Sequence, residues 1–260
     1  FLIIAEDRDA AAYLQNDLAG LLEKKPVHFF PDSFKRPGFF EEINPTHVQM
    51  RAEVIHSLAV SRSAGEILVT YPEALFEQVL SPSVLQSNRL DIAIGEQLSI
   101  EDMSAFLIDF GFSMEDFVFE PGQFSVRGGI VDIFSYGNEL PYRIELFDVE
   151  VEAIRTFNPL TQLSMQNIQR ISIIPNINKG FHKKDKVSFF SILPPGSIIW
   201  IKSPGMLSDK LDACFEKAEA FAKTISILDE SEIAGLFREK PFLSSKQVLQ
   251  DILSKPLISF

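Results

Sequence analysis

Three short blocks rich in apolar residues stand out in the first seventy positions of the chain. They cover residues 1–5, 27–30 and 67–70. Apolar runs of four or five residues without regular polar alternation are typical of strands that are covered on both faces, as in a parallel sheet. We therefore predict three buried strands in this region of the chain.

The segments between these blocks have helical character. Asp7 is of the residue type that caps a helix, and the apolar residues after it follow the 3.6-residue period. The periodic positions are Ala10, Tyr13, Leu14, Leu18, Leu21 and Leu22. Residues 48–60 and 72–80 also predict helices, the second with Pro72 in its first turn. Alternating strands and helices imply a parallel sheet covered by helices.

The pattern changes near residues 81–83 and takes a period of two between residues 117 and 157. Such alternation, interrupted by turn residues, is typical of antiparallel strands. Ser99 begins a capping-box sequence that predicts a short helix ahead of these strands. Gly128-Gly129 separates two strand-like segments, which predicts either a two-residue hairpin turn or a bulge. We favour the turn.

The last third of the chain returns to mixed character, with a predicted strand at 198–202 and a predicted helix at 207–224. We predict an α/β fold in three regions. Residues 1–88 form a first α/β region, residues 89–175 form an inserted, smaller β-rich α+β domain, and residues 176–260 form a return segment.

The composition is that of a globular protein with a large core. The chain has 260 residues, of which 46% are hydrophobic, a net charge of −12 at pH 7 and a sequence pI of about 4.8. This acidic balance argues against extensive nucleic-acid binding, which requires clustered Lys and Arg. The 24 Phe residues, against 4 Tyr and 1 Trp, most simply fill the core. The alternative is a functional aromatic platform.

Location is predicted from the same sequence. The chain has one cysteine, no basic leader sequence and no apolar run of about 18 residues, the length that spans a membrane. We expect a cytoplasmic protein. The first residue is Phe1 and not Met, so we interpret the chain as a piece of a longer protein.

The motifs of common catalytic and cofactor sites are missing. No Gly is followed by Lys, and neither GxGxxG nor GxSxG occurs, which removes the phosphate loop, the dinucleotide fingerprint and the nucleophile elbow. The four His residues have no metal-ligand spacing, and Cys214 is interpreted as an inert buried thiol. We therefore expect a non-catalytic chain without a metal or a cofactor of its own.

Two charged segments have weaker functional interpretations. Residues 227–230 resemble the acidic end of a Mg²⁺-binding strand, but without a phosphate loop they more simply begin a helix. The basic residues 179–186 either contact DNA or form a solvated connector, and we favour the connector.

The most informative segment is residues 141–147. Strand alternation places Tyr142, Ile144 and Leu146 on one face, which is apolar. Arg143, Glu145 and Phe147 then share the opposite face. A Phe beside an Arg on an exposed face is typical of protein interfaces, where arginine and aromatic residues dominate the binding energy. The alternative is that Phe147 folds over the sheet edge onto another element.

Three motifs resemble the N-terminal, UvrB-like module of bacterial transcription-repair-coupling factors (Mfd). They are EPGQFSVRGGIVDIF at 120–134, ELPYRIELF at 139–147 and IRTFNPLTQ at 154–162. The resemblance is dense over residues 111–163 and weaker upstream. It implies a module of three subdomains, called 1a, 2 and 1b in chain order. Subdomains 1a and 1b are similar to a helicase-type α/β fold without a working phosphate loop.

The same resemblance implies a function. The middle subdomain would dock on UvrA after a motor elsewhere in the full-length protein has displaced stalled RNA polymerase. That motor is an ATP-dependent DNA translocase, so ATP, Mg²⁺, DNA and RNA polymerase would bind regions absent from this chain. Other domains of the full-length protein would be able to mask the docking surface. The alternatives from other classes are a damaged-DNA-binding fragment and an ATP-binding fragment of a UvrB-like helicase.

Matching the motifs residue by residue places the UvrA contacts on Arg127, Arg143 and Phe147, with Gly128 and Gly129 as turn-forming support. The family usually has Gly-Asp or Asp-Asp after the aromatic residue, whereas this chain has Asp148-Val149. We expect one exposed patch whose side chains contribute little to folding, so that Arg143→Ala and Phe147→Ala lose UvrA binding and keep their melting temperature.

Overall fold

The chain forms two compact units in the computed structural model, which describes residues 1–22, 25–60, 66–136, 138, 140–177, 181–226, 229 and 231–259. Unit 1 consists of Phe1–Pro82 and Phe181–Phe260, and unit 2 consists of Ser83–Gly180. Unit 2 is therefore one continuous segment, and unit 1 is assembled from the segments on either side of it.

Unit 1 is built on a parallel sheet of five strands in the order β17-β16-β1-β5-β2. The strands are β1 (Leu2–Ile4), β2 (Val27–Phe29), β5 (Ile67–Thr70), β16 (Ile199–Ile201) and β17 (Leu257–Ser259). The apolar blocks of the sequence thus form the predicted parallel strands, and β1 lies between two of them, pairing with both β5 and β16.

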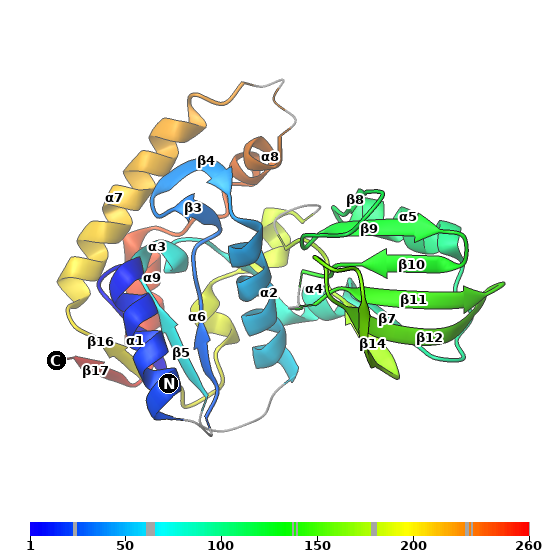
Figure 1. Ribbon diagram of the computed structural model, residues 1–260. Helices are drawn as coiled ribbons and strands as arrows, with labels where there is room; N and C mark the ends of the chain where they lie inside the picture. The colour runs from blue at the N-terminus through cyan, green and yellow to red at the C-terminus, as the bar shows by residue number, and fades with distance from the viewer. Residues whose placement is uncertain are drawn as a thin grey trace. The chain divides into compact units, whose positions relative to one another are not determined.

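Seven helices of unit 1 accompany this sheet in the described residues. They are α1 (Arg8–Leu21), α2 (Pro45–Val60), α3 (Pro72–Leu75), α6 (Phe189–Ile192), α7 (Pro204–Ala222), α8 (Glu232–Glu239) and α9 (Ser245–Leu253) (Figure 1). Asp7 caps α1 as predicted, because its carboxylate accepts a hydrogen bond of 2.9 Å from the amide of Ala10. The helix is present as predicted, but Tyr13 and Leu21, which fall on its apolar period, are exposed.

The predicted helix at 72–80 is also wrong over its second half. The helix ends at Leu75, and Val79–Leu80 forms strand β6, which pairs with β15 (Lys186–Val187). The backbone amide of Gln78 donates to the carbonyl of Pro241 over 2.7 Å. A distant segment of the chain therefore takes the backbone groups that continuation of the helix would need.

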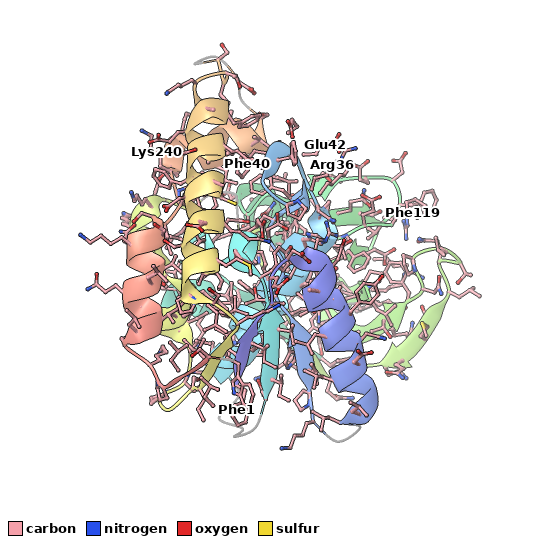
Figure 2. The ribbon with its side chains drawn as sticks, turned by 90° about the vertical axis from the view of Figure 1, so that its left-hand side faces the viewer. Phe1, Arg36, Phe40, Glu42, Phe119 and Lys240 are labelled. Carbon is pink, nitrogen blue, oxygen red and sulfur yellow. The ribbon has the colours of Figure 1, made fainter. Side chains whose placement is uncertain are left out.

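The phenylalanines of unit 1 form a cluster of ring contacts. Phe40, on strand β4 (Phe39–Ile43) of a hairpin with β3 (Phe34–Arg36), lies beside α7 (Figure 2). The rings in mutual contact are Phe34, Phe40, Phe76, Phe221, Phe237 and Phe242. Their neighbouring centroids lie between 4.6 and 6.5 Å apart. The interpretation of Phe as a core residue is confirmed for Phe34, Phe40, Phe76 and Phe237, which are buried, whereas Phe221 and Phe242 are half-buried.

Unit 2 is built on a six-stranded sheet in the order β13-β12-β11-β10-β9-β8. The strands are β8 (Ser113–Met114), β9 (Gln123–Arg127), β10 (Ile130–Ile133), β11 (Tyr142–Phe147), β12 (Glu150–Phe157) and β13 (Ser164–Asn167), and Figure 1 shows the four central ones side by side. All neighbours are antiparallel except β8 and β9. The period-two segment of the sequence forms the predicted antiparallel strands.

The remaining elements of unit 2 flank this sheet in the sequence. They are α4 (Pro82–Ser87), β7 (Leu90–Ala93), α5 (Ile100–Asp109) and β14 (Arg170–Ile173), with β7 and β14 paired. Ser99 caps α5 by accepting a hydrogen bond from the amide of Asp102, as predicted.

The prediction of a mixed α/β protein with a parallel sheet and a separate β-rich region is confirmed. The helicase-like character of unit 1 and the division at residues 88 and 175 stay predictions. The strand predicted at 198–202 and the helix predicted at 207–224 are present as β16 and α7, and the helix begins at Pro204. The weaker segments at 227–230 and 179–186 lie largely or partly outside the described residues.

Candidate functional site

Strand β11 alternates as the sequence predicts. Tyr142, Ile144 and Leu146 are buried, whereas Arg143 and Glu145 are half-buried and Phe147 is exposed. The neighbouring strands place further polar residues on the second side of the sheet. We call this side the arginine face and define it by Ser125, Arg127, Asp132, Arg143, Glu145, Phe147 and Arg155.

Gly128 and Gly129 form the predicted turn between β9 and β10. Arg127 lies directly opposite Ile130, so the loop has two residues and no bulge. Gly128 has a φ of 61°, a conformation that favours glycine. A Cβ atom on Gly129 would lie 2.6 Å from the carbonyl oxygen of Leu146. Glycine is therefore required at both positions, at the first for its dihedral angle and at the second for close approach of β11.

Arg127 and Arg143 meet at one carboxylate, that of Asp132. Nε and Nη2 of Arg143 donate to Oδ1 and Oδ2 of Asp132 over 2.8 and 2.9 Å. Nη2 of Arg127 donates to Oδ2 over 2.5 Å. Asp132 is fully buried, while the side chains of Arg127 and Arg143 retain 37% and 15% exposure. The two arginines thus share a buried anion between them.

Two loop segments cover this carboxylate. The carbonyl of Asp116 accepts from Arg127 over 2.9 Å, and the carbonyl of Gln162 accepts from Arg143 over 3.1 Å. The side-chain amide of Gln162 donates to the carbonyl of Val118 over 3.1 Å, which joins the two segments. These two segments bond to both arginines that pair with Asp132, whose side chain has no exposure to solvent.

Each arginine also lies over an aromatic ring. The guanidinium carbon of Arg127 is 5.2 Å from the ring centre of Phe117, and that of Arg143 is 4.6 Å from the ring centre of Phe157. Both distances are within the range of cation–π attraction. The hydrogen bonds to Asp132 raise the pKa of Arg143 further above its ordinary value, so this guanidinium stays charged.

Phe147 stands at the end of the β11–β12 hairpin with 73% of its surface exposed. The turn consists of Asp148, which has a φ of 58°, and Val149, which is also exposed. The amide of Leu98 donates to the carbonyl of Val149 over 2.7 Å and holds the turn from one side. The tip therefore presents two apolar side chains, Phe147 and Val149, beside the exposed carboxylates of Asp148 and Glu150, and backbone hydrogen bonds fix it.

These observations correct the expectation of one uniformly exposed patch. Phe147 is exposed, but Arg143 is half-buried and its guanidinium is engaged by Asp132. Four residues along a strand span about 13 Å, so the arginine pair and the aromatic tip occupy separate areas of the same face. The sequence reasoning missed Asp132 and also the ion pair between Glu145 and Arg155 on adjacent strands.

A hollow of about 460 Å³ opens beside Arg127. Its lining residues include Met114 from β8, Asp116 and Phe117 from the covering loop, and Ser125 from β9. Met114 and Phe117 are both more than half exposed. Apolar surface is therefore available next to the more exposed of the two arginines.

Unit 1 holds a second group of buried polar residues, at the end of β2. The hydroxyl of Tyr71 donates to Oδ1 of Asp32 over 2.6 Å, and Nδ1 of His47 lies 2.9 Å from the Asp32 carbonyl oxygen. Burial and the nearby charge of Glu77 raise the pKa of Asp32 to about 7, and burial lowers the pKa of His47 to about 4. No motif in the sequence predicts this group of buried polar residues.

The described residues contain no group of three or more His, Cys, Asp or Glu side chains placed to hold a metal ion. Cys214 is buried, as predicted, and burial raises the pKa of its thiol to about 12. Among the helices of the described ranges, none has the length and apolar character needed to cross a lipid bilayer.

Comparisons with known proteins match this chain to one domain family and one group of relatives. Residues 90–178 match the sequence model of the UvrB interaction domain family. The transcription-repair-coupling factor of Bacillus subtilis (strain 168) is 32% identical over 174 residues, which cover 66% of this chain and 14% of that protein. The factors of Staphylococcus aureus strains bovine RF122 / ET3-1 and Mu50 / ATCC 700699 are each 30% identical over 173 residues, with the same coverage.

The chain spans 14% of the length of these curated relatives. The family match covers the whole six-stranded sheet of unit 2, including the arginine face. Residues 90–178 therefore match the UvrB interaction domain family, in a chain that is similar over 66% of its length to bacterial transcription-repair-coupling factors.

Proposed function

We propose that unit 2 is a non-catalytic docking module that binds UvrA within a transcription-repair-coupling factor. The observation that carries this proposal is the arginine face itself. It displays an exposed Phe and two ordered arginines inside the segment that matches the UvrB interaction domain. Arg127, Arg143 and Phe147 are the residues to which we assign the contact.

Phe147 is the proposed anchor. A phenyl ring that stays in water on a rigid hairpin gains roughly 2 kcal/mol or more when a partner buries it. The hairpin is already held by backbone hydrogen bonds on both sides, so little conformational freedom is lost on binding. This combination supports a binding role for the tip.

The arginines supply the polar component of the proposed contact. Nε of Arg127 has no hydrogen bond to any described residue, and its side chain is more than one third exposed. Arginine pairs with carboxylates through two parallel, charge-assisted bonds, which lysine reproduces poorly. An acidic residue of UvrA next to an apolar pocket would complement this face.

The wider role follows from the relatives and not from this chain. In our proposal the module recruits UvrA to the site of a stalled RNA polymerase, which couples transcription to nucleotide excision repair. ATP-driven translocation and the contacts with DNA and RNA polymerase would belong to other domains of the full-length protein. Some of those domains would also be able to cover the docking face.

Calorimetric titration of purified UvrA with this chain tests the proposal. We expect Phe147→Ala to weaken binding roughly thirtyfold or more, since loss of a central anchor costs about 2 kcal/mol. Tyr13→Ala is the matched control, because Tyr13 is an aromatic residue of unit 1 with a similar exposed fraction, 75%. Absence of binding by the unmodified chain would refute the function, and full affinity of Phe147→Ala would refute the assigned surface.

A further inference from the structure

Asp132 is the most deeply buried charged residue of the arginine face. It lies on β10 directly opposite Arg143 of β11 and Ser125 of β9. Its neighbours in sequence, Val131 and Ile133, point to the apolar side of the sheet and are fully buried. A buried carboxylate costs several kcal/mol in desolvation, so its presence requires the arginines that pair with it.

The hydrogen bonds fix Arg143 in one position. Nε and Nη2 both bond to Asp132, and Nη1 donates to the carbonyl of Gln162. The guanidinium plane is therefore held at three points, over the ring of Phe157. A free arginine side chain at a surface samples many rotamers, and these are lost when it binds a partner.

Arg127 is fixed by the same carboxylate from the other strand. Nη2 donates to Asp132, while Nη1 donates to the carbonyl of Asp116 and to Oγ of Ser125 over 2.9 and 3.1 Å. Nε of Arg127 makes no hydrogen bond with any residue that the structure describes. One buried carboxylate thus sets which donors of both arginines remain available.

We propose that Asp132 is the positioning residue of the docking face, which it serves without touching the partner. This inference rests on the proposed binding of UvrA. It assigns to Asp132 the task of ordering Arg127 and Arg143 before binding, so that their free donors meet partner carboxylates without a further entropic cost. The shared anion also lets two like charges stand close together on one small surface.

Asp132→Asn separates this role from simple electrostatics, because the two predict opposite results. The substitution keeps the shape of the side chain and adds one net positive charge to the face. If charge alone mattered, binding to an acidic partner surface would become tighter. Positioning predicts weaker binding instead, by roughly tenfold or more, since two long side chains must then be ordered on association.

Asp116→Asn is the matched control. Asp116 is exposed, and only its backbone carbonyl bonds to Arg127. This change therefore removes one negative charge beside the arginine face and leaves the bonds around Asp132 intact. We expect unchanged or slightly tighter binding. Asp132→Glu is the second variant, because it retains the charge and displaces the carboxylate by one methylene. We expect it to weaken binding as well.

A spectroscopic measurement on the unmodified chain does not depend on any variant folding. In ¹⁵N NMR spectra, the Nε–H proton of Arg143 should exchange slowly with water. The relaxation of the Arg127 Nε–H signal should be that of a rigid side chain. In Asp132→Asn both signals should take the properties of mobile arginines, while the backbone amides of β9 to β11 keep their shifts. Phe147→Ala should leave both Nε–H signals unchanged.

The outcomes are distinct. If the unmodified chain does not bind UvrA, the proposed function is refuted. The NMR signals of Arg127 and Arg143 then still test whether Asp132 orders the two side chains. The positioning role is overturned if the Nε–H groups are mobile in the unmodified chain. It is also overturned if Asp132→Asn binds UvrA at least as tightly as the unmodified chain does. If Asp132→Asn does not fold, full affinity of Asp132→Glu overturns it and reduced affinity supports it.

Discussion

Arg143→Ala removes both hydrogen bonds that Arg143 gives to the buried carboxylate of Asp132. Truncation of one partner of a buried ion pair costs about 3–5 kcal/mol of stability, because the other charge is left without compensation. Two features reduce this figure here. Arg127 still donates to Oδ2, and the space left by the side chain gives water a path to the carboxylate. We expect a loss of about 2–3 kcal/mol in the free energy of unfolding of unit 2.

The two units carry separate probes for the measurement. The single Trp of the chain, Trp200, lies in β16 of unit 1, so its fluorescence follows the unfolding of that unit. Amide hydrogen exchange in β10 and β11 follows unit 2. We expect exchange in these strands to accelerate roughly 30- to 150-fold in Arg143→Ala, the factor that corresponds to about 2–3 kcal/mol. The urea midpoint from Trp200 fluorescence should stay unchanged.

Arg155→Ala is the control on the adjacent strand. Arg155 pairs with Glu145, and both side chains are about one third exposed. Surface ion pairs of this kind contribute about 0–1 kcal/mol, so exchange in β11 should rise no more than about fivefold. Equal exchange in the two variants, or an effect of Arg143→Ala below this limit, would show that the buried carboxylate is not held as the structure indicates.

Three further predictions concern the rest of the chain. Because the pKa of Asp32 is raised to about 7 from 3.8, its contribution to the free energy of unfolding should fall as pH rises between these values. Urea titrations of Asp32→Asn should lack this loss, and an unchanged dependence of stability on pH in this variant would contradict the assignment. The chain should not hydrolyse ATP, because no Gly-Lys pair is present for a phosphate loop, and phosphate release that co-elutes with the protein through repurification would refute this. Double-stranded DNA should bind weakly with a shallow salt dependence, since the net charge is −12, and a submicromolar dissociation constant near physiological salt would count against it.

The sequence was most informative where a pattern is local. Strand alternation placed Arg143, Glu145 and Phe147 on one face, and the Gly128-Gly129 pair indicated the two-residue turn. Both conclusions depend only on neighbouring residues and on the period of a strand. The cap at Asp7 was predictable for the same reason, because the capping carboxylate and its amide donor are three residues apart.

The sequence was least informative where burial or the end of an element depends on segments that are distant in the chain. No local pattern indicates that Asp132 is buried, because its arginine partners are also bonded by loops near residues 116–118 and 159–162, which are distant in sequence. The end of α3 depends on backbone pairing of Gln78 with Pro241, far along the chain. Hydrophobic periodicity indicated the helix that contains Tyr13 and Leu21 but not that these two side chains are exposed.

The insertion of unit 2 into unit 1 has a consequence for the order of events during synthesis. Strand β1 needs β16 on one side, and the Phe cluster needs rings from α7 and α8, all of which come after unit 2 in the chain. Unit 2 is continuous and is able to complete its sheet as soon as residue 180 has emerged. At about 5–20 residues per second, β1 waits on the order of ten seconds for its second neighbour. During this interval an apolar strand edge is exposed on the nascent chain, and it is this edge that a chaperone would have to cover.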